Sequence, residues 1–143
     1  MESKTKNRKS REQIERMALR AFGLGLAAGE EALVELKQGW FNAAYTVRLA
    51  DGREVVLKIA PPQGAEIMTY ERNIMATVVA AMRLVRANPA VPVPEIYSFD
   101  QAHDLCDSNY FFMQKIAGDN LEQVAASLPA ETREAVERQI GEI

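Results

Sequence analysis

The stretch AYTVRLADGREVVLKI, residues 44–59, determines the architecture of this chain, because two alternating segments flank a tight-turn signal. Apolar and polar side chains alternate over residues 44–49 and again over residues 54–59, which is the period of a half-buried β-strand. Asp51-Gly52 between them is typical of a type I′ turn, whose two central residues both need positive φ. The stretch therefore predicts an antiparallel β-hairpin.

Further strand and helix patterns extend this hairpin into an α+β fold. Residues 32–37 predict a strand before the hairpin, and residues 96–99 and 110–114 predict two strands after it. One long helix is expected over residues 65–87. The predicted fold is thus a five-stranded antiparallel sheet with one long helix. The inward stripe of that helix is expected to contain Ile67, Glu71, Ile74, Met75, Val78, Met82 and Val85.

Helices are also predicted on both sides of the sheet segment. Ser10 with Gln13 fits a capping box, which predicts an amphipathic helix near the N-terminus. Asp119 with Glu122 predicts the cap of a short helix, and another helix is expected over residues 130–140.

Composition and charge argue against two classes of partner. The net charge of −3 at pH 7 and the pI near 5.3 leave no broad cationic surface for nucleic acid. No run of about 20 apolar residues could span a bilayer, and the start has no apolar stretch typical of a signal peptide. We therefore expect no nucleic-acid partner, no membrane partner and a cytoplasmic location. Clustered Lys and Arg residues predict a basic flexible tail over residues 1–9.

The polar stretch over residues 100–109 holds the single histidine, His103, and the single cysteine, Cys106. A lone cysteine excludes an internal disulfide and a cysteine-based zinc site. A catalytic pair with His103 is one interpretation, but nothing nearby would orient it, so an exposed loop is favoured. No metal site is expected in this chain.

Three other segments carry candidate binding residues. The loop over residues 39–43 could place main-chain N–H groups over phosphates, or it could be an ordinary hairpin turn. Alternation puts Lys58 on the same face as Val56, so a cation stands at the end of an apolar strand; an outward-facing lysine is the alternative. The strand over residues 110–114 runs into an extended segment before Gly118, which offers free main-chain groups at an edge.

These segments resemble the aminoglycoside phosphotransferase family, which includes choline-kinase-like enzymes, over about residues 33–121. The order of three strands, a helix and two strands is similar to the small lobe of protein-kinase-like enzymes. The resemblance implies a nucleotide-binding small lobe over residues 30–117, preceded by the helical segment 10–29 and followed by the start of a helical large lobe over residues 118–143. The motifs that carry the resemblance are GWFN (39–42), VLK (56–58), PVPEI (92–96) and FMQKIAG (112–118).

The resemblance implies that ATP is the ligand and that Lys58 holds its phosphates. The remaining residues that it implies are Gly39, Trp40, Phe41 and Asn42 over the phosphates, Val56 and Tyr45 above the adenine, Met113 behind it, and the main-chain carbonyl of Gln114 and N–H of Ile116 bonded to the base.

A carboxylate on the following helix pairs with the lysine in such enzymes. Glu71 is the only charged residue on the predicted inward stripe, where an unpaired carboxylate would be costly to bury. The register of the family instead places the acid at Val78, roughly 10 Å further along the helix. Either Glu71 takes the role or the pair is lost.

The reaction implied is transfer of the γ-phosphate of ATP to a hydroxyl of a small molecule. The catalytic aspartate and the magnesium ligands of the family are expected beyond Ile143, so we expect the 143-residue chain alone to be inactive. The alternatives are an inactive kinase-like nucleotide-binding domain, a degenerate remnant, and an α+β interaction domain whose resemblance is accidental.

Overall fold

The computed structural model describes residues 6–39, 41–66 and 73–143. Its elements, in chain order, are α1 (Arg11–Phe22), η1 (Glu30–Ala32), β1 (Leu33–Glu35), β2 (Ala43–Arg48), β3 (Glu54–Ile59), α2 (Ile74–Arg86), β4 (Ile96–Asp100), β5 (Tyr110–Gln114), α3 (Leu121–Val124), η3 (Ala125–Ser127) and α4 (Ala130–Glu142).

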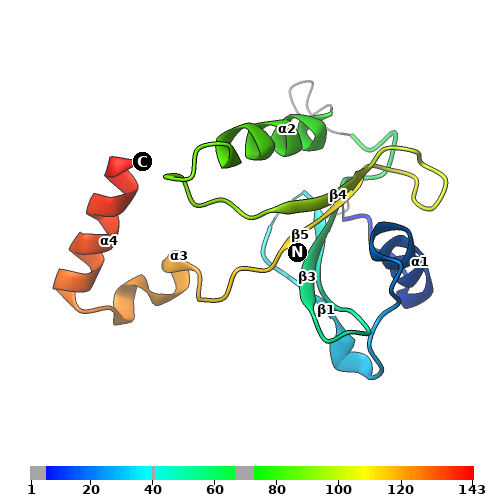
Figure 1. The fold of residues 1–143 in the computed structure, drawn as a ribbon, viewed down its shortest axis with the longest axis horizontal. Helices are drawn as coiled ribbons and strands as arrows, with labels where there is room; N and C mark the ends of the chain where they lie inside the picture. Colours follow the sequence, from blue (N-terminus) through cyan, green and yellow to red (C-terminus); the bar gives the residue numbers. More distant parts are fainter. Residues whose placement is uncertain (1–5, 40, 67–72) are drawn as a thin grey trace.

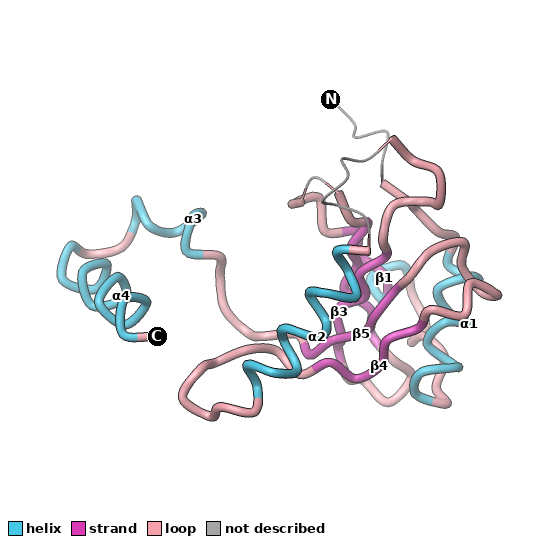
Figure 2. The backbone as a smooth tube through the Cα atoms, turned by 90° about the horizontal axis from the view of Figure 1, so that it is seen from above, coloured by secondary structure: helices cyan, strands magenta, loops and turns pink. Residues whose placement is uncertain are grey.

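The five strands form one antiparallel sheet in the order β1-β2-β3-β5-β4, which confirms the predicted α+β fold class. Helices α1 and α2 lie on opposite faces of this sheet (Figures 1 and 2). The face toward α1 is built from the alternating residues Val55, Leu57 and Ile59 of β3. The other face carries Phe111 and packs against α2. Each strand residue therefore belongs to one of two separate environments.

The central hairpin forms as predicted, but its turn is of another type. Leu49 N–H donates to Arg53 O over 2.8 Å, and Gly52 N–H donates to Leu49 O over 2.9 Å. Gly52 has φ of 88°, whereas Asp51 is not among the described residues with positive φ. This is a three-residue loop, a turn followed by a left-handed glycine, so the prediction of a type I′ turn was wrong.

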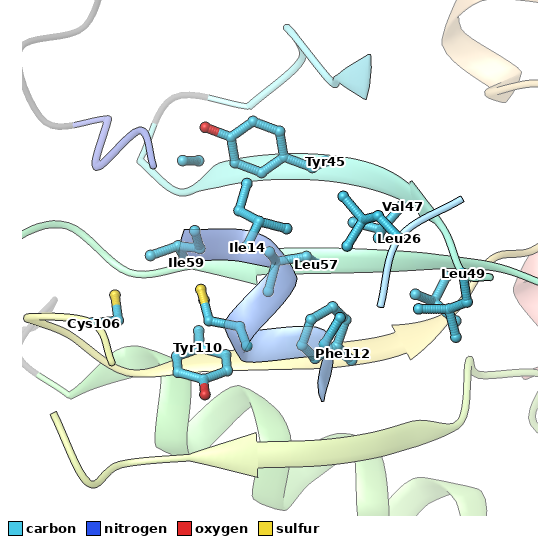
Figure 3. Close-up of a cluster of buried hydrophobic side chains, with 14 residues drawn as sticks. Ile14, Leu26, Tyr45, Val47, Leu49, Leu57, Ile59, Cys106, Tyr110 and Phe112 are labelled. Carbon is cyan, nitrogen blue, oxygen red and sulfur yellow. The ribbon is translucent and has the colours of Figure 1, made fainter. Parts of the chain in front are cut away.

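Helix α1 covers one face of the sheet through a buried apolar stripe. Ile14, Met17 and Ala18 are fully buried against side chains of β2, β3 and β5, among them Leu57 and Phe112 (Figure 3). The predicted capping box begins the helix: Ser10 Oγ accepts from Gln13 N–H, and Gln13 Oε1 accepts from Ser10 N–H. Gly23, with φ of 68°, ends it.

Helix α2 is shorter than predicted, and of the predicted inward stripe Met75 is buried and Met82 and Val85 are half-buried. It begins at Ile74, after the left-handed Asn73, and residues 65 and 66 are not helical. Met75 and Val79 are buried against the sheet, whereas Ile74 and Val78 are 45% and 41% exposed. The helix contacts the sheet along one narrow line, which the abundance of apolar side chains on α2 did not reveal. Ile67 and Glu71 lie outside the described residues.

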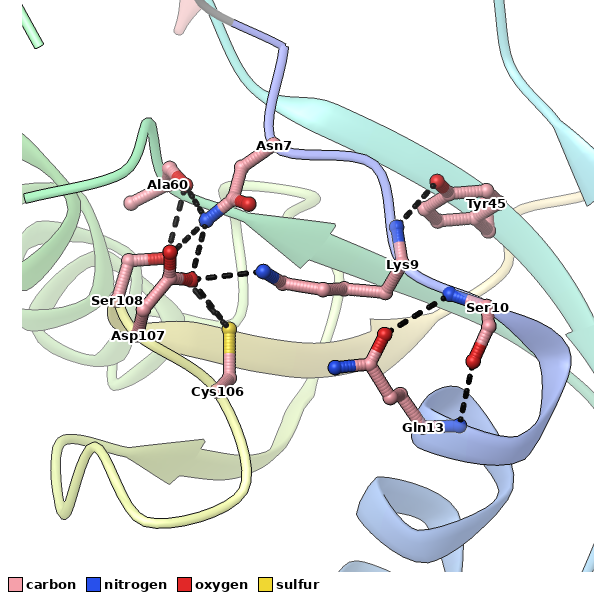
Figure 4. A network of polar contacts seen from close by, with 9 residues as sticks. All are labelled: Asn7, Lys9, Ser10, Gln13, Tyr45, Ala60, Cys106, Asp107 and Ser108. Carbon is pink, nitrogen blue, oxygen red and sulfur yellow. Dashed lines mark hydrogen bonds and ion pairs between the residues drawn. The ribbon is translucent and has the colours of Figure 1, made fainter.

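The first described residues are not the flexible tail that the sequence predicted. Asn7 is 7% exposed, and its amide donates to Asp107 Oδ1 and Ser108 Oγ, each over 2.8 Å (Figure 4). Lys9 Nζ forms an ion pair with Asp107 at 2.8 Å. The predicted exposed loop is confirmed in part: residues 101–104 and Asp107 are exposed, whereas Cys106 and Ser108 are buried beneath this segment.

The C-terminal helices stand apart from the sheet (Figures 1 and 2). None of the residues of α3 or α4 is buried. The cap of α3 is Asn120, whose side chain accepts from Glu122 N–H over 3.0 Å, rather than the predicted Asp119. Across the described part of the chain, no helix is both long and apolar enough to cross a membrane.

Candidate functional site

A cavity of about 450 Å³ opens on the sheet face opposite α1. Its floor comes from alternate residues of β2 and β3, because the register pairs Ala44 with Lys58 and Thr46 with Val56. The segment after β5 supplies the far wall. The lining residues are Leu36, Gln38, Ala44, Thr46, Val56, Lys58, Pro94, Met113, Gln114, Lys115 and Ile116.

Lys58 is the cation at the base of this cavity. It is half-buried near the end of β3, between Ala44 and Phe111 on the neighbouring strands. Burial lowers the pKa of the Lys58 amine, because desolvation disfavours its charged form. No carboxylate of the described residues forms an ion pair with it. A bound anion would restore the interactions that this charge loses on burial.

Of the two candidate positions for the helix acid, Glu71 and Val78, the structure describes only Val78. Glu71 lies outside the described residues, so its pairing with Lys58 stays a prediction. Val78, the position that the register favoured, is 41% exposed on α2. It offers neither a charge nor an inward direction.

None of the described residues of the predicted phosphate loop, residues 39–43, lines the cavity. Leu36 and Gln38 contribute to the lining, whereas Gly39, Phe41 and Asn42 do not. Gly39 has φ of 108°, a conformation that side chains rarely adopt. Phe41 is 50% exposed. Trp40 lies outside the described residues.

Tyr45 is not brought to the cavity. It pairs with Leu57 in the β2–β3 register, so its ring packs on the α1 face and is 5% exposed. Its hydroxyl accepts from Lys9 N–H over 3.3 Å, and burial raises its pKa. Ala44 and Thr46 stand where Tyr45 was expected. The register of the β2–β3 hairpin would have identified Ala44, because it pairs directly with Lys58 and its side chain lies on the same face.

The far wall agrees with the predicted positions of Met113, Gln114 and Ile116, all of which line the cavity beside Val56. Ile116 is 57% exposed, so it contributes an open rim rather than a closed lid. Lys115 also lines this wall, but its Nζ is paired with Glu54 Oε2 at 2.6 Å. Lys115 and Pro94 were missed by sequence reasoning, since each depends on the path of the chain after a strand or before one.

The other candidate chemistry does not assemble. His103, at φ of 57°, is bonded through its two ring nitrogens to Gln63 and Asn109, while Cys106 is buried beside Ser108. Each side chain therefore has a separate structural environment. Within residues 6–39, 41–66 and 73–143, no group of three His, Cys, Asp or Glu side chains could hold a metal ion.

Comparison with known proteins identifies the family. The phosphotransferase enzyme family, APH, matches residues 32–143. Two subtelomeric hrmA-associated cluster proteins from two strains of Aspergillus fumigatus are each 28% identical over 112 residues, which is 78% of this chain and 21% of theirs. The chain thus spans about a fifth of the length of these relatives. The match covers the sheet, the Lys58 cavity and the helices that follow, and this chain belongs to the APH phosphotransferase family, whose kinases use ATP.

Proposed function

We propose that the cavity beside Lys58 binds ATP, and that the protein containing this lobe transfers the γ-phosphate to a hydroxyl of a small molecule. The observation that carries the proposal is the half-buried Lys58 at the base of an otherwise largely apolar cavity. An apolar space suits a purine ring, and a buried cation without a described carboxylate partner suits phosphate.

In this proposal the base and the phosphates of ATP contact different lining residues of the cavity. Val56, Ala44 and Met113 provide apolar surface for the base. Lys58 would hold the phosphates. Gln38 also lines the cavity and belongs to the loop between β1 and β2. Lys115 is a weaker candidate for phosphate, because it is already paired with Glu54. Magnesium and the acceptor hydroxyl are not assigned to residues of this chain.

A second candidate is a lobe that binds nucleotide without transferring phosphate. It is favoured by the exposed Val78 at the register position of the helix acid. The two candidates share the same binding site and differ in turnover, so binding and phosphorylation are measured separately.

The test is ATP binding by the full-length protein, measured by calorimetry for wild type and Lys58→Met. Methionine keeps the apolar stem and removes the charge. The expected loss of affinity is roughly 10- to 150-fold, the equivalent of about 1.5–3 kcal/mol for a hydrogen bond to a charged group. Transfer of labelled phosphate from ATP to candidate alcohols should stop in the same variant.

Lys115→Met is the matched control, because it removes a lysine from the same cavity wall. Since Lys115 is an exposed residue paired with Glu54, its loss should change ATP affinity by no more than about twofold. Unchanged binding in Lys58→Met would remove Lys58 from the site, and an equal loss in both variants would overturn the assignment of the phosphates to Lys58 in preference to Lys115.

A further inference from the structure

The end of β5 shows which main-chain groups are engaged in the sheet. Ala60 N–H donates to Asn109 O over 2.9 Å, which makes these two residues a hydrogen-bonded pair. Bonded and non-bonded pairs alternate in antiparallel strands, and counting back along β3 makes Val55 and Gln114 a non-bonded pair. The main-chain N–H and carbonyl of Gln114 therefore point away from β3, toward the segment that enters β4.

Only one of these two groups is used there. Gln114 N–H donates to Glu95 O over 2.8 Å. In a regular antiparallel pair, the return bond would run from Glu95 N–H to the main-chain carbonyl of Gln114. Here Glu95 N–H donates instead to the side-chain Oε1 of Gln114, over 3.3 Å. The side-chain carboxamide of Gln114 thus accepts the hydrogen bond from Glu95 N–H that the main-chain carbonyl of Gln114 would otherwise accept.

The segment that enters β4 is also held from outside the sheet. Arg86, in the last turn of α2, donates to Val93 O over 3.1 Å and to Glu95 Oε2 over 3.4 Å. Pro94 has no N–H and cannot add a ladder bond. These contacts fix the position of Glu95, so that its N–H stays within reach of the Gln114 side chain.

The released carbonyl belongs to a residue of the cavity wall. Gln114 lines the cavity together with Val56, Met113 and Pro94. Its side chain starts from the α1 face, the face of its partner Val55, so the part of Gln114 available to the cavity is the main chain. A carbonyl accepts hydrogen bonds and donates none, so it favours a base with an amino group over one with an oxo group at the same position.

We propose that the side chain of Gln114 is a positioning group that sets the base preference of this site. By occupying Glu95 N–H, it leaves the Gln114 carbonyl free to accept from the 6-amino group of adenine. The proposal rests on the proposed ATP site. It assigns to this side chain a role that requires no contact with the nucleotide.

The test compares ATP with inosine triphosphate, which differs in carrying an oxo group at position 6. Dissociation constants for both are measured with the full-length wild type, Gln114→Leu and Gln114→Glu. Wild type should prefer ATP. In Gln114→Leu, Glu95 N–H engages the main-chain carbonyl, and the preference should fall by roughly fivefold, the loss of one hydrogen bond. Gln114→Glu keeps an acceptor and should retain the wild-type preference.

The outcomes separate this inference from the proposed function. Absence of ATP binding in wild type overturns the proposed function itself. ATP binding with a preference that Gln114→Leu leaves unchanged overturns only the role of Gln114, as does an equal loss in Gln114→Glu. If Gln114→Leu unfolds at the assay temperature, Gln114→Met removes the same acceptor with an unbranched side chain and is judged by the same ratio.

Discussion

At the scale of single residues, Lys58 lowers the stability of the free protein and favours the binding of phosphate. Its amine is half-buried, and its pKa is lowered because burial removes water from the charged form. The same desolvation strengthens its attraction for a phosphate that enters the cavity. A side chain that costs stability in the free protein is therefore the one that we assign to ligand binding.

We predict that Lys58→Met is more stable than wild type at pH 7 without nucleotide, by a few degrees in unfolding temperature. Because the unfolded lysine binds a proton more tightly than the folded one, wild-type stability should rise with pH between the lowered pKa and the ordinary value of 10.5. That rise should be smaller in the variant. Thermal unfolding followed by circular dichroism from pH 7 to 10.5 measures both effects.

A lower unfolding temperature for Lys58→Met across this pH range would contradict the prediction. It would mean that Lys58 is stabilised in the free protein by a partner such as Glu71, which lies outside the described residues. Glu71→Gln would then produce the same loss as Lys58→Met.

Residue placement could be predicted wherever a local pattern fixes it. The alternation of residues 54–59 put Lys58 and Val56 on one face, and the structure agrees. Tyr45 was misplaced because its face depends on the register across the hairpin, which the turn type sets. The prediction that Tyr45 lies above the adenine came from the family resemblance and took no account of that register.

At the scale of elements, the segment before α1 is fastened to the loop before β5 (Figure 4). Asn7 donates to Asp107 and Ser108, and Ser108 Oγ in turn donates to Ala60 O over 2.9 Å. Ala60 directly follows β3. This network therefore joins the N-terminal segment to the strand that carries Lys58.

We predict that Asn7→Ala lowers the free energy of unfolding by about 1–3 kcal/mol, because the buried Ser108 Oγ loses its donor. Urea denaturation followed by fluorescence of the single Trp40 provides the measurement. Lys6→Ala is the control, since the side chain of the half-buried Lys6 makes a longer bond of 3.3 Å to Lys37 O, at a solvent-exposed position. Equal effects of the two substitutions would show that the buried network adds nothing.

The boundaries of elements could be predicted where chemistry marks them. The prediction gave β3 and β5 their observed bounds, and the capping box correctly began α1. Helix α2 was extended too far because its start is set by the left-handed conformation of Asn73, which asparagine adopts only occasionally. The hydrogen bonds of Asn7 could not be predicted from the sequence, since its partners are distant along the chain.

At the scale of the whole molecule, the sheet with α1 and α2 forms the packed body, and α3 and α4 extend away from it (Figure 2). The connecting residues 115–120 are exposed. Ile140 of α4 is 57% exposed and makes no contribution to either apolar cluster.

We predict that the amides of α4 exchange with deuterium in the 143-residue chain at least about a hundredfold faster than those of β3 and β5, because no packing opposes their opening. Hydrogen exchange followed by mass spectrometry distinguishes the peptides of these elements. The amides of α1 serve as an internal control, since Ile14 and Met17 are buried. Protection of α4 equal to that of β5 would show that it packs on the body.

The bond between Asn7 and Ser108 joins positions 101 residues apart, and this separation has a consequence during synthesis. A ribosome adds roughly 5–20 residues each second, so Asn7 waits several seconds or more before its partners have been made. The apolar stripe of α1 waits equally long for Phe112 of β5. The segment that carries Asn7 and α1 therefore leaves the ribosome several seconds before the loop and strand that fix it in place.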